Sequence, residues 1–294
     1  MERTGIGTGG MTMAQESPNK RQDPLATTAS QYEVKQRRTL RLSQPTARDK
    51  MLVRYIALAL ILIAWELYGR SVNPVLFTYP VAIVQAAVDM VADGTLLEAT
   101  LQTLTVLGIG ATAGVILGIA TGLLAGRNWV AKQALDIPIN ALYALPAVAL
   151  IPVIVLWFGF GDSAKIFIVA FFVFFPVVIN TTRGVEEVDS ELLEVTRSFC
   201  SPERAVWRDL LIPASLPYVF TGIKLAIGRG LVGVIVAEFF TAISGLGNLI
   251  VTNSNTFQTD RTFVPIVMLS LIGVVLTAIL GWVERALAPW RRDN

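Results

Sequence analysis

The stretch "EVTRSFCSPERAVWRDLLIP" (residues 194–213) decides the arrangement of this chain, because it places six charged side chains between two long apolar segments. Moving six charges into the hydrocarbon core of a bilayer would cost on the order of 18 kcal/mol, at about 3 kcal/mol each. The neighbouring segments, residues 165–183 and 220–242, carry few charges and are long enough to cross a hydrocarbon core about 30 Å thick. The charged stretch is therefore expected to lie outside the membrane that its neighbours cross.

The composition of the whole chain supports a membrane protein. Of its 294 residues, 53% are hydrophobic and only 16% are charged, and the mean hydropathy is +0.59, whereas charged residues make up about a quarter of a soluble domain. The fold class predicted is an all-α integral membrane protein with six transmembrane helices. These are expected at about residues 52–69, 101–125, 134–157, 165–183, 220–242 and 264–284.

The distribution of Lys and Arg predicts the topology. Residues 1–50 are polar and are predicted to be a disordered cytoplasmic tail, and residues 51–294 form the transmembrane domain. A basic cluster at 35–41 precedes the first span, and residues 71–100 contain no Lys or Arg. By the positive-inside rule, both termini and the loop at 184–217 are cytoplasmic.

One apolar segment outside the six spans could be mistaken for a seventh. Residues 81–92 are apolar, but twelve residues are too few to cross a bilayer. A seventh span would also place the Arg-rich loop outside. The segment is therefore predicted to be an external or interfacial helix.

Several function classes are disfavoured by what the sequence lacks. It contains no histidine and one cysteine, so no internal disulfide can form, and no catalytic group set or metal site is predicted. The net charge of +2 gives no reason to expect nucleic acid as a partner. An ion-coupled secondary transporter would be expected to carry ionisable residues near the middle of several spans, whereas here they are nearly confined to 220–242.

The charged stretch has its own helical pattern. Apolar residues recur at helical spacing from Leu192 to Phe199, and a second short helix is predicted with Ser201 as its N-cap, Pro202 at its first position and Pro213 at its end. A helical hairpin of this kind suits a docking surface for a soluble partner. The alternative is an amphipathic loop lying on the membrane, and the physical pattern alone leaves both open.

At these residues the chain resembles the permease subunits of binding-protein-dependent ABC importers. Their cytoplasmic signature runs Glu-Ala-Ala, three residues, Gly, nine residues, Ile, any residue, Leu-Pro. The spacing is intact here, and the positions are filled by Glu194, Val195, Thr196, Cys200, Leu210, Ile212 and Pro213. Cysteine replaces the usual glycine, which puts the sharp turn between the two helices in question.

The resemblance covers roughly residues 74–290 and is to the nitrate, sulfonate, taurine and bicarbonate group. It implies that the loop is a coupling helix gripped by an ATPase subunit. It also implies two copies of this permease, two ATPase subunits, an external solute-binding protein and a place in the bacterial inner membrane. This chain contains no P-loop, so no cofactor is expected on it, and ATP and Mg²⁺ are expected on the ATPase partner.

The resemblance leaves the substrate open within limits. A small anion such as an aliphatic sulfonate, taurine or nitrate is expected first, with a vitamin precursor or an aromatic acid as the alternative. The solute-binding protein is expected to supply most of the selectivity.

Glycine recurs at every fourth position of the second span, which leaves a bare ridge along which another helix can approach closely. The five positions are Gly110, Gly114, Gly118, Gly122 and Gly126. The ridge is expected to serve helix packing, within one subunit or at its edge. The plainer alternative is that glycine is simply common in membrane helices.

Prolines and charges mark candidate residues of the translocation path. Pro138, Pro146 and Pro152 in the third span each remove a backbone hydrogen bond, so this helix is expected to bend and to line the path. Arg229 and Glu238 are nine residues apart and point to opposite sides of the fifth span, so they cannot pair. Arg229 either meets an anionic substrate or pairs with a neighbouring group. Glu238 either lines an external gate or is satisfied by a neighbouring helix.

Overall fold

The computed structural model describes residues 47–241 and 243–287, and these residues are helical apart from short connections. The predicted disordered tail therefore lies almost wholly outside the described residues. The helices are α2 (Ala47–Ser71), α3 (Pro80–Ala92), α4 (Thr95–Arg127), α5 (Trp129–Ala144), η1 (Ala147–Leu150), α6 (Ile151–Phe158), α7 (Asp162–Glu186), α8 (Ser190–Ser198), α9 (Glu203–Val206), η2 (Trp207–Leu211), α10 (Ile212–Thr241), α11 (Leu246–Asn255) and α12 (Thr259–Leu287).

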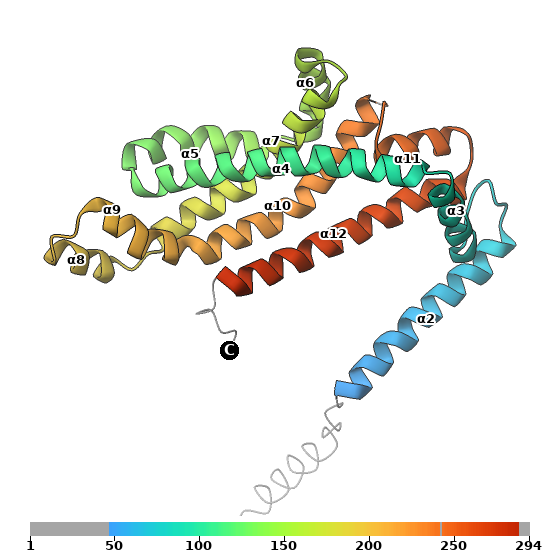
Figure 1. Cartoon of the computed structure of the whole chain (residues 1–294), viewed down its shortest axis with the longest axis horizontal. Coiled ribbons are helices and arrows are strands. Elements are labelled where there is room, and N and C mark those ends of the chain that lie inside the picture. The colour runs from blue at the N-terminus through green and yellow to red at the C-terminus, as the bar shows by residue number, and fades with distance from the viewer. Residues whose placement is uncertain (1–46, 242, 288–294) are drawn as a thin grey trace, which may run out of the picture. The chain divides into compact units, whose positions relative to one another are not determined.

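Contacts divide the chain after Leu60 into two units. The described part of the first unit is the N-terminal half of α2, whose side chains at residues 48–60 are exposed. The second unit begins at Ile61 and holds all the other helices. In this unit α7 packs between α4 and α10, and α10 also contacts α12, while α8 and α9 lie at one end and α3 and α11 at the other (Figure 1).

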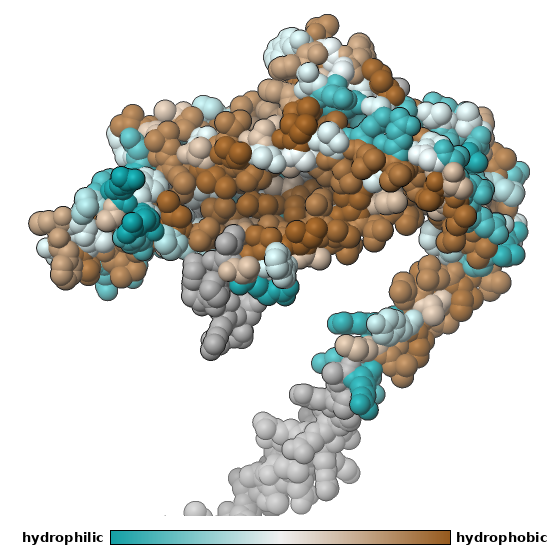
Figure 2. All heavy atoms as spheres, viewed as in Figure 1, coloured by the Kyte–Doolittle hydropathy of each residue, from teal (hydrophilic) through white to brown (hydrophobic). Residues whose placement is uncertain are grey.

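The core of the second unit lies where α4, α7 and α10 meet. Val106, Val173 and Val234, one from each helix, are almost fully buried in this cluster. Apolar side chains cover the outside of the helical body as well, and hydrophilic side chains gather at its two ends (Figure 2). This distribution is typical of a protein whose middle is surrounded by lipid rather than water.

Among the described residues, five helices are long and apolar enough to cross a membrane, and the count reaches six if α5 and the following η1–α6 segment form one broken span. These two pieces meet at an angle of 91°. The bend expected in the third span, at 134–157, is therefore present, and it lies between α5 and η1. Pro146 and Pro152 explain the break, because Pro146 precedes η1 and Pro152 lies in the first turn of α6, where a missing N–H does no harm.

The segment predicted as a short helix outside the six spans is α3. It has 13 residues, and its buried residues Ile83 and Met90 belong to the same cluster as Val264 and Leu269 of α12. The packing of α3 onto α12 gives its apolar face a partner within the protein.

The second helix of the charged stretch differs from the prediction. It begins after Pro202, which occupies the N-cap position that had been predicted for Ser201. Pro213 does not end it, because α9, η2 and α10 follow one another without a gap and residues 203–241 form one helical run. The η2 segment is a π-helix, and this wider turn accommodates Pro213 at the start of α10 without breaking the helix.

Candidate functional site

The charged loop presents a helix with an unburied apolar face. In α8 the side chains of Leu192 and Val195 are 49% and 50% exposed, and Phe199, one turn further on, is 80% exposed. The Asp189 side chain caps the start of α8 by accepting a hydrogen bond from the Glu191 N–H at 2.8 Å. An ordered helix with three exposed apolar side chains is typical of a protein-binding surface.

The other side of this loop is fixed to the helical body. Val206 and Leu211 are buried against Val185 at the end of α7. Arg127, the last residue of α4, makes two hydrogen bonds with the Glu203 carboxylate at 2.9 and 3.1 Å. These contacts link the loop to the ends of α4 and α7, and η2 continues directly into α10.

The turn between α8 and α9 keeps the geometry that the glycine of the signature would allow. Cys200 has a φ of +46°, so its backbone is left-handed even though it carries a side chain. The other signature residues lie on both sides of this turn. Glu194, Val195 and Thr196 are in α8, Leu210 is in η2, and Ile212 and Pro213 begin α10.

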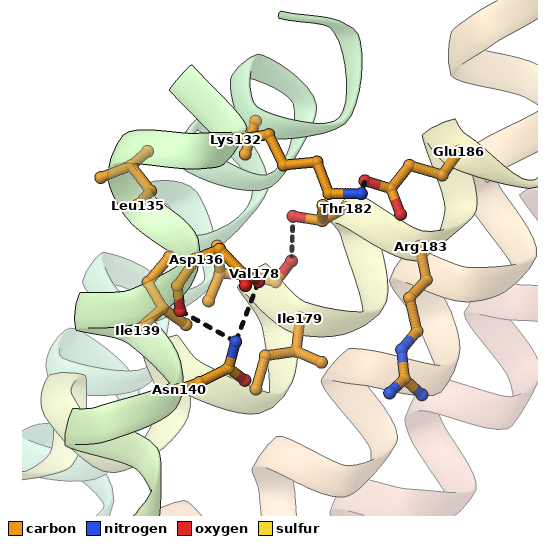
Figure 3. A pocket seen from close by; sticks show the side chains of 11 residues that line it. Lys132, Leu135, Asp136, Ile139, Asn140, Val178, Ile179, Thr182, Arg183 and Glu186 are labelled. Carbon is orange, nitrogen blue, oxygen red and sulfur yellow. Dashed lines mark hydrogen bonds and ion pairs between the residues drawn. The ribbon is translucent and has the colours of Figure 1, made fainter. Parts of the chain in front are cut away.

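A polar cavity of about 190 Å³ opens between α5 and α7 near this loop (Figure 3). Lys132 and Glu186 form an ion pair of 2.7 Å across it, and the Asn140 amide donates to the Asp136 carboxylate at 2.9 Å. Arg183 extends from α7 away from that ion pair and is exposed, with no ion pair among the described residues. The cavity is thus the polar region where α5 meets the helix that carries the loop.

The helix α5 contains Pro138, one of the three prolines of the predicted third span, and has no buried residue. Pro146 and Pro152, on the following segment, are also exposed. Arg229 of α10 reaches this face. Its guanidinium donates to the Tyr143 hydroxyl at 2.9 Å, and its Cζ atom lies 4.6 Å from the centre of the Tyr143 ring. Arg229 is exposed and has no acidic partner among the residues that the structure describes.

Glu238, the second charged candidate, is fully buried. Its carboxylate accepts hydrogen bonds from the Thr103 hydroxyl at 2.8 Å and from the Gly247 N–H at 2.7 Å. The Thr103 oxygen in turn accepts the Leu246 N–H at 2.8 Å. Of its two expected roles, the structure supports a carboxylate satisfied by neighbouring helices, here holding the start of α11 against α4.

Lys165, in the first turn of α7, is a buried charge that the sequence did not reveal. Only 1% of it is exposed, and its Nζ donates to the Ser244 hydroxyl at 2.6 Å and pairs with Asp162 at 3.1 Å. Together with Glu238 it fixes the connection between α10 and α11. No sequence pattern could have found this, since its partner Ser244 is 79 residues away.

The glycine ridge faces α7 within the same chain. A methyl group at any of the five positions would lie between 2.6 and 2.9 Å from an atom of α7, such as Val173 or Val177. Real Cβ atoms do not approach so closely, so glycine is required for the contact of α4 with α7. In this part of the core, the backbone of α4 therefore packs directly against side chains of α7.

Comparison with known proteins agrees with this arrangement. The family described as "Binding-protein-dependent transport system inner membrane component" matches residues 114–293. The putative aliphatic sulfonates transport permease protein SsuC of Bacillus subtilis is 31% identical over 80% of this chain and 86% of its own length. The formylaminopyrimidine transport permease protein ThiX of Halalkalibacterium halodurans is 29% identical over 80% of this chain and 94% of its own length.

A solved structure shares the fold. The crystal structure of an amino acid ABC transporter with histidines matches with a TM-score of 0.51 and 18% identity, over 69% of this chain and 97% of the other. This likeness concerns the arrangement of helices alone.

Proposed function

Because this chain belongs to the family of binding-protein-dependent transport system inner membrane components, it is a permease subunit of an ABC importer, and we propose that it transports small anions, aliphatic sulfonates first. It is a multi-pass protein of the bacterial inner membrane, it is not an enzyme, and it works with an ATPase and a solute-binding protein.

The single observation that carries the choice of an anion is Arg229. A charge within a membrane span is expensive and marks a function by default. This guanidinium is held in place by Tyr143 and lacks an acidic partner among the described residues. An oriented cation on the exposed face of α10 would attract a sulfonate, because charge-assisted hydrogen bonds to such groups are strong.

The complete importer is proposed to contain two copies of this chain and two ATPase subunits. The exposed face of α5 and the exposed residues Pro146 and Pro152 support a second copy, whose matching face would enclose the path between them. ATP and Mg²⁺ would be bound by the ATPases. Both termini and the loop that carries α8 would be cytoplasmic, with Leu192, Val195 and Phe199 entering a cleft of the ATPase.

The proposed mechanism is a rigid-body change. Closure of the ATPase pair on ATP would move α8, and the Arg127–Glu203 contact together with the buried residues Val206 and Leu211 would carry this motion into α4, α7 and α10. The path would then switch between its inward and outward states.

A second substrate class is favoured by one observation. The ring of Tyr143 lies on the same exposed face as Arg229 and could stack against a flat heterocycle. One relative is named for formylaminopyrimidine transport, so a vitamin precursor of this kind, or an aromatic acid, is the alternative.

The test is reconstitution of this chain with its ATPase in proteoliposomes, with the purified binding protein supplied outside. We expect ATP hydrolysis to rise when the binding protein carries an alkanesulfonate, and uptake of the sulfonate to require ATP. Arg229→Gln should reduce sulfonate uptake about tenfold or more while leaving the stimulated ATPase in place, because it removes an interaction with the anion and no contact of the loop.

Uptake that survives ATP depletion and collapses with the ion gradient would instead indicate a secondary transporter. Stimulation by a pyrimidine and not by sulfonates would favour the alternative substrate.

A further inference from the structure

A cavity of about 420 Å³ lies at the end of the second unit opposite the charged loop. Its walls are the α2–α3 connection, α3 and the α11–α12 turn, and we call it the outer pocket. Figure 1 shows α3 and α11 at one end of this unit and α8 at the other. If α8 meets the ATPase in the cytoplasm, as proposed above, the outer pocket opens on the external side.

The outer pocket is acidic. Asp89 of α3 and Asp260 of α12 both line it, and neither carboxylate has an ion pair among the described residues. Thr78 lines it too, is only 3% exposed, and its hydroxyl has no hydrogen-bond partner in the described part of the chain. A buried polar group without a partner costs about 1–3 kcal/mol, and this hydroxyl lies just beneath the surface of the pocket wall.

A strained aromatic residue stands at the same pocket. Phe257 has a φ of +57°, and 70% of it is exposed to solvent. A left-handed backbone costs a residue with a side chain about 1–2 kcal/mol, and exposure of a large apolar ring adds to that. Glycine would avoid both costs. Strain retained at an exposed site points to a function of the side chain, and aromatic side chains are frequent anchors of protein interfaces.

The two walls of the pocket are tied together. The Thr259 hydroxyl donates to the carbonyl oxygen of Val75 at 2.6 Å, across 184 residues of sequence. The pocket is therefore a formed feature of the fold and not a gap between loose loops. A preformed site loses less freedom on binding.

We propose that the outer pocket receives a lysine or arginine side chain of the solute-binding protein, with Phe257 as the apolar anchor beside it. This inference rests on the proposed function in two respects, since the transported solute is taken to be an anion and α8 is taken to meet the ATPase in the cytoplasm. Two unpaired carboxylates would repel such a solute, so they suit the basic group of a protein partner and not the substrate.

The experiment uses the whole importer in lipid nanodiscs, with the purified binding protein loaded with an alkanesulfonate. ATPase activity is measured against binding-protein concentration. For the double variant Asp89→Asn/Asp260→Asn we expect the binding-protein concentration that gives half-maximal ATPase activity to rise about tenfold. The maximal rate should be unchanged and the dependence on salt weaker.

The matched control is Asp93→Asn. Asp93 lies at the same end of the protein but does not line the pocket, and its hydrogen bonds from the Thr95 side chain and backbone N–H lower its pKa. Its replacement should leave the half-maximal concentration as in the unchanged chain.

Phe257→Gly separates docking from folding. Glycine relieves the backbone strain, so we expect thermal stability to be equal or higher while the half-maximal concentration rises severalfold. If both the double variant and Phe257→Gly respond to the binding protein like the unchanged chain, the inference is overturned and the proposed function stands. If the unchanged importer does not respond to the loaded binding protein at all, the proposed function fails first and takes the inference with it.

Discussion

At the scale of single residues, Glu238 of α10 links its own helix to two others. Its carboxylate joins three helices, because it accepts from Thr103 of α4 and from Gly247 at the start of α11 while belonging to α10 itself. A methyl group on Gly245 would overlap the same carboxylate. The glycines around the α10–α11 connection are therefore needed to let the backbone approach a buried charge.

Glu238→Ala should destabilise the protein by about 1–3 kcal/mol for each polar group left without a partner. The Thr103 hydroxyl and the Gly247 N–H are the two groups affected, so α11 should loosen as well. We expect a lower unfolding temperature and faster hydrogen exchange in residues 246–255. Glu98→Ala is the matched control, since Glu98 is an exposed carboxylate of α4 and should cost little. Equal unfolding temperatures for the two variants would contradict the assigned role.

Some features of single residues could be predicted from the sequence, and others could not. Spacing alone placed Cys200 at the turn of the loop, because the signature fixes its position along the chain. It could not say that cysteine would adopt the left-handed backbone itself, which depends on how α8 and α9 pack. The partners of Glu238 and Lys165 were out of reach for the same reason, since Thr103 and Ser244 meet them only through tertiary packing.

At the scale of helices, the contact of α4 with α7 depends on the glycine ridge. At Gly118, a methyl group would lie 2.9 Å from Val177 and 3.0 Å from the Phe174 carbonyl oxygen. Both atoms are part of a packed helix and cannot move aside freely. The sequence predicted a close helix contact from the four-residue repeat, but not which helix would fill it.

Gly118→Ala should therefore cost about 1–3 kcal/mol through overpacking. Gly108 of the same helix provides the control, because a methyl group there would meet nothing within 4 Å. Gly108→Ala is expected to be neutral or slightly stabilising, since alanine is the better helix former. Thermal unfolding of the purified complex compares the two variants. A similar loss for both would show that the ridge is not a packing surface.

Helix ends were harder to predict than helix existence. Prolines in the third span indicated a bend, but the sequence did not reveal that the bend would reach 91°. Pro213 was expected to end a helix, and the π-helix at 207–211 carries the chain past it instead. In both places the conformation of the neighbouring turn, and not proline alone, decides whether the helix stops.

At the scale of the whole molecule, the orientation in the membrane is a prediction from the positive-inside rule. The single cysteine makes it testable, because Cys200 is exposed on the charged loop. A membrane-impermeant maleimide should label Cys200 in inverted membrane vesicles and leave it unlabelled in intact cells or right-side-out vesicles. The reverse result should be seen for Asp93→Cys combined with Cys200→Ser. Labelling of Cys200 from outside would overturn the proposed orientation and the contact with the ATPase.

The unbroken run of helix from Glu203 to Thr241 has a mechanical consequence. Its 39 residues amount to a rod of roughly 58 Å at 1.5 Å per residue. At one end Glu203 accepts a hydrogen bond from Arg127 of α4, and near the other end Glu238 accepts one from the Gly247 N–H of α11. A rotation of about 10° around the middle would displace each tip by about 5 Å in opposite directions. Such opposite displacements of the two helix ends would widen the translocation path on one side of the membrane and narrow it on the other.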